Sequence, residues 1–461
     1  MKQLIIISIF LIFFTQCNAQ SVVKNETLEG KWFLEWESND IGTVRTFMEF
    51  HTNNGKFEAN SRKKAGRDIL GSWNSTLVRI FTKSLRYGSF LNITEGIYET
   101  EIDTLKFAGY FKSLIGTYII RGYIYNDTLN AKLTNGREEI KGTITGIRKN
   151  TETPLENYSS LFETSIKITE NNIYNKDVLQ TKKWRSFEKD MQNVSKKVQD
   201  DLEMVAAFFF HARKLPFSHY GMMKLQEYKE DKNNQKEIKH VFLEEKSDQT
   251  VYMKINSFSG PKAEMDSIFS IIIQKNYKNL IVDLRNNSGG SIEAAIPFAQ
   301  NLVDTTIYGG IFLTQKWFNK HKTPPALNEY KDFPHFSEAN FDLIIEGIHN
   351  TEGLCLKIVP YGNIYKGNVF ILTNKKTAST CEPIVYGLKQ HKRAIIVGEK
   401  TAGSMLNGEL IYVANGFSLI IPTADYYTSD GYKIDHNGVI PDIEIKQEKA
   451  LDYVMGKLIK D

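Results

Sequence analysis

From Val251 onward, short apolar runs alternate with segments in which apolar residues recur every three or four positions. The runs "TVYMKI", "NLIVDLR", "NVFILTN" and "AIIVGE" have the length and composition of strands. The segments between them, "KAEMDSIFSIIIQK", "SIEAAIPFAQNLV" and "EPIVYGLKQH", have the helical period. Because strands that alternate with helices form a sheet whose strands are mostly parallel, the pattern predicts an α/β domain, which we place at residues 241–461.

Two other regions precede this domain. Residues 27–150 carry short alternating runs such as "TFMEFH", "KFAGYF" and "TYIIRGYIY", separated by turn signals such as "TNNG" and "YND". They predict an all-β domain, comparable to a lipocalin-like one, and the period does not distinguish a barrel from a sandwich. Residues 155–240 are charged and mostly have the helical period, which predicts a helical cap segment.

The first 19 residues differ from the rest. Lys2 precedes the apolar run "LIIISIFLIFF", and small residues follow it. This run is shorter than the ~20 apolar residues that cross a bilayer. It therefore predicts a signal peptide at residues 1–19, cleaved after Ala19, and an exported protein that is periplasmic or secreted. The alternative is lipidation of Cys17, which would anchor the protein to a membrane.

Charge and composition exclude some function classes. The chain has 58 Lys and Arg against 54 Asp and Glu, a net charge of +4 without a dense basic block, which argues against nucleic acid as a partner. No set of His, Cys, Asp and Glu has the spacing of metal ligands, so we expect no metal or other cofactor.

The stretch "LIVDLRNNSGGS", residues 280–291, joins a predicted strand to a predicted helix. Gly289 and Gly290 allow backbone N–H groups to approach a ligand closely, next to the positive end of the helix. By themselves these residues are more typical of a tight strand-to-helix turn. They are not a phosphate loop, because no Gly-Lys-Ser/Thr follows.

The stretch "KKTASTCEP", residues 375–383, is a second strand-to-helix turn. It offers four candidate nucleophiles, which are Thr377, Ser379, Thr380 and Cys381. A hydroxyl at such a turn is exposed at the carboxyl end of the strand, as in a nucleophile elbow, although the glycine-flanked motif is absent. A Ser/Thr cluster before a helix is also typical of plain N-capping, and this stretch alone favours capping.

Four segments occur in a fixed order: "DLRNNSGG", "TASTCE", "VGEKTAG" and "NGVIPDIEI". In order and spacing they strongly resemble the tricorn-like and C-terminal-processing family of serine peptidases, over roughly residues 210–447. The resemblance implies a ClpP/crotonase-like catalytic domain that cleaves a peptide or protein substrate without a cofactor.

The resemblance also implies the nucleophile. Aligned on Glu382, Ser379 takes the position of the family's catalytic serine, and Cys381 becomes a small apolar filler. The C-terminal-processing branch uses a lysine as base, but Ser404 stands at that position. Lys400 is the one nearby lysine that a Ser-Lys alternative could use.

The tricorn-like branch uses a Ser-His pair and a late carboxylate instead. The matching residues are Ser218 and His219 in "LPFSHYG" and Asp435 before the "GVIPDI" motif, where Glu is usual. The resemblance then makes His219 the general base, with Ser218 and Asp435 orienting it. The implied oxyanion hole consists of the backbone N–H groups of Gly289 or Gly290 and of Thr380.

Only about thirty residues, 221–250, separate "SHYG" from "VYMKI", too few for the PDZ domain of ~90 residues that many relatives carry. Substrate selection must then come from elsewhere, and the aromatic-rich insertion 305–362 is a candidate lid or pocket wall. The alternatives to a peptidase are an inactive protein of the same fold that binds a peptide or ligand, and a hydrolase of another ester or amide.

Overall fold

The computed structural model describes residues 27–38, 42–71, 88–113, 116–136, 138–149, 154–225 and 239–459. The predicted signal peptide and Cys17 lie outside these residues. The chain divides into two compact units, which separate at about residue 153. The predicted helical segment and the predicted α/β domain belong to the second unit, and the boundary placed between residues 240 and 241 stays a prediction.

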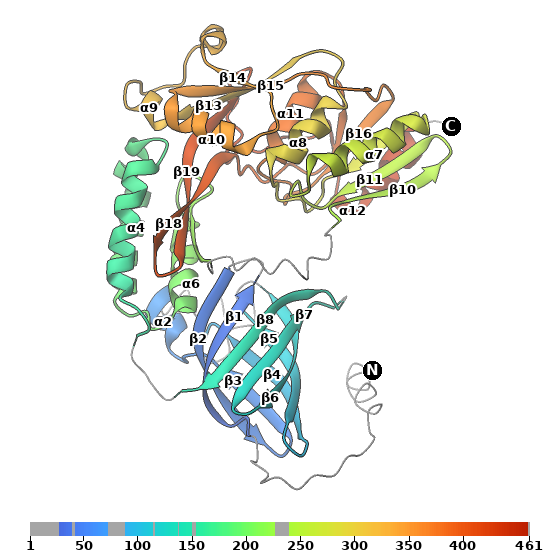
Figure 1. The fold of residues 1–461 in the computed structure, drawn as a ribbon. Helices are drawn as coiled ribbons and strands as arrows, with labels where there is room; N and C mark the ends of the chain where they lie inside the picture. Colours follow the sequence, from blue (N-terminus) through green and yellow to red (C-terminus); the bar gives the residue numbers. More distant parts are fainter. Residues whose placement is uncertain are drawn as a thin grey trace. The chain divides into compact units, whose positions relative to one another are not determined.

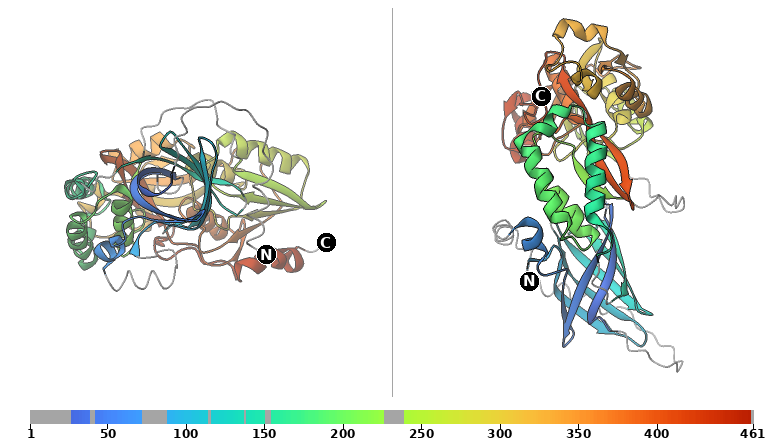
Figure 2. Two further views of the ribbon diagram at one scale, coloured as in Figure 1. Left: turned by 90° about the horizontal axis from the view of Figure 1, so that it is seen from below. Right: turned by 90° about the vertical axis from the view of Figure 1, so that its left-hand side faces the viewer.

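The first unit is an eight-stranded antiparallel barrel, so of the two open alternatives the barrel is correct and the sandwich is wrong (Figures 1 and 2). Each strand pairs with the next, β8 pairs with β1, and a further β1–β2 pairing closes the ring. A short helix, α2 (Ala65–Leu70), interrupts the predicted all-β region. The strands are β1 (Gly30–Ser38), β2 (Gly42–Asn53), β3 (Lys56–Asn60), β4 (Asn92–Thr100), β5 (Leu105–Lys112), β6 (Thr117–Tyr125), β7 (Thr128–Thr134) and β8 (Ile140–Arg148).

Alternate residues of these strands fill the barrel. Trp36 of β1 and Phe111 of β5 are both buried, and their rings meet edge to face with centroids 5.0 Å apart. Closure leaves no free strand edge, and the alternation of buried and exposed residues that it requires is the pattern visible in the sequence.

The second unit contains the predicted α/β sheet, with the strand order β10-β11-β12-β16-β17-β20. Every neighbouring pair is parallel except β10 and β11. The strands are β10 (Val241–Ser247), β11 (Thr250–Ile255), β12 (Asn279–Asp283), β16 (Asn368–Thr373), β17 (Ile395–Gly398) and β20 (Ile443–Glu444). The helices between them are α7 (Lys262–Gln274), α8 (Ile292–Gln300) and α11 (Cys381–Gln390), and α12 (Gln447–Tyr453) follows β20.

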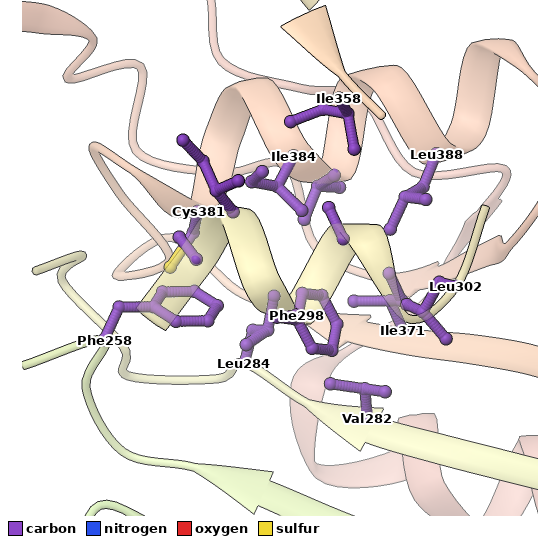
Figure 3. Close-up of a cluster of buried hydrophobic side chains, with 14 of the residues drawn as sticks. Phe258, Val282, Leu284, Phe298, Leu302, Ile358, Ile371, Cys381, Ile384 and Leu388 are labelled. Carbon is purple, nitrogen blue, oxygen red and sulfur yellow. The ribbon is translucent and has the colours of Figure 1, made fainter. Parts of the chain in front are cut away.

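The central strands β12 and β16 are buried on both faces, which is why they read as unbroken apolar runs. Val282 and Ile371 face α8 and α11 in one cluster of buried side chains (Figure 3). Ile281 and Phe370, each one residue earlier along its strand, lie in a second cluster with Ala450 of α12. The carboxyl ends of β12 and β16 are neighbours, so the two glycine- and serine-rich turns leave the sheet at the same edge.

A second, mostly antiparallel sheet, which the sequence analysis did not predict, has the order β9-β19-β13-β15-β14, with β18 paired to β19. The insertion 305–362 supplies three of its strands. The elements are β9 (Gly221–Lys224), β13 (Ile307–Thr314), α9 (Gln315–Phe318), η3 (Leu327–Asp332), β14 (His335–Phe336), α10 (Phe341–Asn350), β15 (Gly353–Ile358), β18 (Leu406–Ala414) and β19 (Phe417–Thr428).

The predicted helical segment contains α4 (Tyr158–Asn172), η2 (Lys176–Gln180), α5 (Lys182–Ser195) and α6 (Asp201–Ala212). Asp200 caps α6 by accepting a hydrogen bond of 2.9 Å from the N–H of Glu203. α4 contacts β18 and β19, and α6 contacts β9 (Figure 1). The chain between α6 and β9 carries Ser218 and His219. The last element is η4 (Val454–Leu458). No helix among the described residues is long and apolar enough to cross a membrane.

Candidate active site

The turn between β16 and α11 leaves one hydroxyl at a cavity and buries another. Ser379 has φ 54°, a left-handed conformation that is unfavourable for serine, and its partly buried side chain lines the cavity described below. Thr377 is fully buried, and its hydroxyl donates to the carbonyl of Leu284 over 2.9 Å. Thr377 therefore holds the turn, and Ser379 is available for chemistry.

Four side chains form one series of hydrogen bonds that begins at Ser379. Its Oγ lies 3.2 Å from Nε2 of His219, and Nδ1 of His219 lies 2.8 Å from Oγ of Ser218. The Ser218 hydroxyl donates to Oδ1 of Asp435 over 2.6 Å. Because the single hydroxyl proton of Ser218 goes to Asp435, Nδ1 of His219 must be the donor toward Ser218. The lone pair of Nε2 then faces Ser379.

The surroundings of His219 keep its ring neutral. Burial lowers the pKa of His219 below its ordinary value, and the charge of Asp435 raises that pKa by a smaller amount. Asp435 is 2% exposed and also accepts the N–H of Met405 over 3.1 Å. A neutral imidazole beside a serine hydroxyl is ready to accept its proton.

Cys381 is fully buried as the first residue of α11, in the cluster that also holds Phe258 and Ile384 (Figure 3). Burial raises the pKa of its thiol. Its Sγ lies 3.7 Å from the carbonyl oxygen of Asn287, and it forms no disulfide. A buried, neutral thiol is a poor nucleophile, so Cys381 fills space.

Glu382, one residue further into α11, organises the loop behind the nucleophile. Its carboxylate accepts hydrogen bonds from the Thr401 hydroxyl and from the N–H groups of Gly403, Ser404 and Ser379, at 2.5, 2.7, 2.8 and 3.1 Å. The side chain is fully buried, and burial raises the pKa of its carboxyl. From the sequence, Glu382 is only the residue on which the motif aligns, and this role was not predicted.

Ser404, which stands where the C-terminal-processing branch has its catalytic lysine, belongs to the same loop. Ser404 accepts the N–H of Ser379 with its own carbonyl over 3.0 Å. Lys400 is exposed, and no hydrogen bond or ion pair within the described part of the chain joins it to Ser379. The geometry therefore favours His219 over Lys400 as the partner of Ser379.

The glycine loop after β12 lies directly against this turn. A Cβ added at Gly289 would come within 2.8 Å of Cβ of Ser379, so only glycine fits there. The side chain of Asn287 accepts the N–H of Gly289 over 2.9 Å, and the hydroxyl of Thr380 donates to the carbonyl of Gly290 over 2.7 Å. The sequence analysis did not single out Asn287, although it lies inside the quoted motif.

A cavity of about 130 Å³ opens beside Ser379 and His219. The insertion 305–362 supplies much of its apolar wall, in agreement with the lid or pocket wall expected from its position. Other lining residues come from α8 and from the first residues of α11 and β18. The apolar lining residues from the insertion are Phe312, Phe336, Phe341 and Leu356, and those from elsewhere include Ile292, Ile296, Ile384 and Met405.

Among the described residues, no group of three or more His, Cys, Asp and Glu side chains could hold a metal ion. The polar groups that face the cavity are the Ser379 hydroxyl, the His219 ring, Thr380, Asn407 and glycine backbone. Such a set can perform nucleophilic and proton-transfer chemistry on a substrate that carries an apolar group.

Known proteases are similar to part of this chain. A carboxyl-terminal-processing protease from Picosynechococcus sp. is 26% identical over 46% of this chain and 44% of its own length. A chloroplastic C-terminal processing peptidase from Tetradesmus obliquus is 25% identical over 43% of this chain and 35% of its own. The chain thus matches less than half the length of these relatives.

A lipoprotein from Streptococcus agalactiae is a similar solved structure, with 18% identity and a TM-score of 0.45 over 67% of this chain and 98% of that one. Residues 249–445 match the family described as Peptidase family S41. The similarity to this family therefore covers residues 249–445 of the chain, which include Ser379 and Asp435.

Proposed function

We propose that this chain is a serine peptidase that cleaves peptide bonds through an acyl-enzyme on Ser379, with His219 as general base. The observation that carries the proposal is the series of hydrogen bonds from Ser379 through His219 and Ser218 to Asp435. Three chain segments far apart in sequence supply these side chains, and a structural role alone gives no reason for their convergence on a hydroxyl that lines a cavity.

The chemistry follows from the proton positions. As Oγ of Ser379 bonds to the substrate carbonyl carbon, its proton moves to Nε2 of His219, and the carbonyl oxygen becomes an oxyanion. Ser218 and Asp435 stabilise the imidazolium through the hydrogen bond at Nδ1. His219 then gives the proton to the leaving amine, the C–N bond breaks, and a water molecule hydrolyses the acyl-enzyme by the same proton path. Backbone N–H groups that hold the oxyanion contribute ~3 kcal/mol each.

The cavity points to the substrate class. Its walls are aliphatic and aromatic, so a peptide with an uncharged apolar side chain next to the scissile bond gains burial there, at ~25 cal/mol per Å². A charged side chain would lose its hydration without a partner. We propose a peptide or protein substrate with an apolar residue before the cleaved bond.

We also propose where the protein is located and how its helical segment and catalytic domain are arranged. The protein is exported by a signal peptide at residues 1–19, and its helical segment caps a catalytic domain of the ClpP/crotonase type. The apolar run after Lys2 supports the first part, and the contacts of α4 with β18 and β19 support the second. N-terminal sequencing of the protein recovered from its host tests export: a start at residue 20 supports it, and a retained Met1 refutes it.

The test of activity is labelling by a fluorophosphonate, which reacts with activated serines, together with hydrolysis of a peptide library. Ser379→Ala and His219→Ala are expected to abolish both. Lys400→Ala is the matched control and is expected to leave both unchanged, because this lysine is exposed.

Three outcomes would contradict the proposal. Continued labelling of Ser379→Ala would show that another residue is the nucleophile. Loss of activity in Lys400→Ala, but not in His219→Ala, would establish the Ser-Lys alternative. A correctly folded chain that binds peptides but neither hydrolyses them nor takes the label would be the inactive binding protein.

A further inference from the structure

Asn407 lines the cavity beside Ser379 and His219 and has no part in the proposed chemistry. It is the second residue of β18, and it is partly buried. The next residue, Gly408, packs against the imidazole, because a Cβ added there would lie 3.0 Å from Cδ2 of His219. An amide side chain therefore stands beside the reacting groups without an assigned role.

Two hydrogen bonds determine which way this amide faces. The hydroxyl of Thr423, on β19, donates to Oε1 of Glu409 over 2.5 Å, whereas the carbonyl oxygen of Asn407, a second acceptor, is 3.5 Å away. Because the single proton of Thr423 goes to Glu409, its oxygen accepts from Nδ2 of Asn407, 2.8 Å away. Nδ2 also donates to Oε1 of Glu409 over 3.3 Å. The nitrogen of the amide therefore faces Thr423 and Glu409.

Glu409 cannot exchange these roles. Its side chain is largely buried, and its Oε2 lies 2.7 Å from Nε2 of His349, in the last turn of α10. An ionised carboxylate accepts hydrogen bonds and donates none. If the amide of Asn407 turned over, its oxygen would face the oxygens of Glu409 and Thr423 without a proton between them. The neighbours of the amide therefore fix its orientation.

The oxygen of the amide is left for a substrate. Among the residues that the structure describes, no hydrogen bond uses Oδ1 of Asn407. Oδ1 and Nδ2 are bonded to the same carbon, so an oxygen turned away from Thr423 and Glu409 is directed to the cavity that Asn407 lines. The rings of Phe312 and Phe336 in the cavity wall offer it no donor. A substrate side chain that displaces water from this oxygen leaves it unpaired, at a cost in binding free energy, unless that side chain donates a hydrogen bond.

We infer that Asn407 is a specificity-determining residue, whose Oδ1 accepts a hydrogen bond from the substrate side chain that occupies the cavity. Thr423 and Glu409 are positioning residues, which keep the oxygen of the amide on the substrate side. The favoured side chain has an apolar body for the walls and one O–H or N–H donor, as threonine has. This inference rests on the proposed function and narrows the substrate proposed there.

The experiment measures kcat/KM of the full chain for four peptides that differ only at the residue before the cleaved bond. Threonine and valine have the same shape and differ by one hydroxyl. O-methylserine and norvaline have the same length, and the oxygen of the first accepts a hydrogen bond but cannot donate one. Asn407→Leu removes the amide, and Glu409→Leu removes the acceptor that orients it. Tyr412→Leu, on the same strand and 64% exposed, is the matched control.

The wild-type chain should cleave the threonine peptide roughly 3- to 10-fold better than the valine peptide, the value of one neutral hydrogen bond, and should prefer norvaline to O-methylserine. In Asn407→Leu the threonine-to-valine ratio should fall to one or below. Glu409→Leu frees the proton of Thr423 for the amide oxygen, so the NH₂ group turns to the cavity and O-methylserine should become preferred to norvaline. Tyr412→Leu should keep both wild-type ratios.

Equal cleavage of the threonine and valine peptides by the wild-type chain would overturn the inference, as would a threonine preference that survives in Asn407→Leu. An equal fall for all four peptides in Asn407→Leu would also overturn it, because Asn407 would then bind the substrate backbone. A merely structural role of Glu409 would leave the preference for norvaline unchanged. If Asn407→Leu fails to fold, the order of the four peptides on the wild-type chain decides. Failure of the proposed function is different, since the wild-type chain would then cleave none of them and take no serine label.

Discussion

Replacing Asp435 by asparagine tests the far end of the hydrogen-bonded series. Asparagine has the same shape, and its Oδ1 can still accept from the Ser218 hydroxyl and from the N–H of Met405, which are 2.6 and 3.1 Å from the carboxylate. The substitution therefore removes the negative charge and leaves the packing in place.

The expected loss follows from the bond that changes. A hydrogen bond to a charged group contributes ~1.5–3 kcal/mol, and each ~1.36 kcal/mol corresponds to a tenfold change in rate. We therefore expect kcat/KM at its pH plateau to fall by roughly 10- to 100-fold. This is less than the ~10⁴-fold loss known for an aspartate in direct contact with the histidine, because the Ser218 hydroxyl lies between them and can redirect its proton.

The same variant also shifts the pH dependence. Activity requires neutral His219, so kcat/KM rises as pH increases through the pKa of that residue. The charge of Asp435 raises this pKa against the larger effect of burial. Without the charge the pKa falls further, and the acidic limb of the profile should move to lower pH.

The assay is the pH profile of kcat/KM for peptide hydrolysis, in wild type, Asp435→Asn and the control His436→Asn. Nε2 of His436 lies 3.7 Å from Asp435, but its side chain is 54% exposed, and Asn tolerates its φ of 64°. The control should match wild type. A plateau within about threefold of wild type in Asp435→Asn, or an acidic limb at higher pH, would refute the reasoning.

Three further predictions concern residues around the nucleophile. In Glu382→Gln an NH₂ group replaces one carboxylate oxygen and must face buried N–H donors, so the free energy of unfolding should fall by ~2–4 kcal/mol in urea denaturation. An unchanged midpoint would show that these hydrogen bonds contribute nothing. Cys381→Ala should keep kcat within about twofold, since the thiol is buried and its pKa raised, and a loss of labelling in this variant would make the thiol the nucleophile. Phe336→Ala removes a ring from the cavity wall and so enlarges the cavity. The ratio of kcat/KM for substrates with an aromatic residue before the cleaved bond to kcat/KM for substrates with a small apolar residue there should rise by ~10-fold. An unchanged ratio would place that substrate residue elsewhere.

The central strands of the parallel sheet were predictable because they are buried on both faces. Residues such as Ile281 and Val282 are both apolar, and a run of this kind has few alternatives to a central strand. The second sheet was not predicted. Its strands come from the insertion and from a hairpin, and the hairpin signal Asn415-Gly416, with φ values of 51° and 79°, was present but not used.

The barrel shows what the alternation of apolar and polar residues along a strand cannot predict. Alternation of buried and exposed residues predicts strands with one inner face, and it is the same for a barrel and a sandwich. The pairing of β8 with β1, and of β1 with β2, decides between them. The first of these pairings joins residues more than a hundred positions apart, such as Trp32 and Arg148, for which the sequence carries no local signal.

The sequence by itself determined the α/β domain and, through the order of four motifs, which hydroxyl, imidazole and carboxylate to consider together. The order of these motifs can be read from the sequence because it is a property of the linear chain. The distances between Ser379, His219 and Asp435 and the burial that lowers the pKa of His219 were decided only by the tertiary structure. Each depends on the direction of a bond or on the dielectric around a group, and both arise only when distant segments pack against one another.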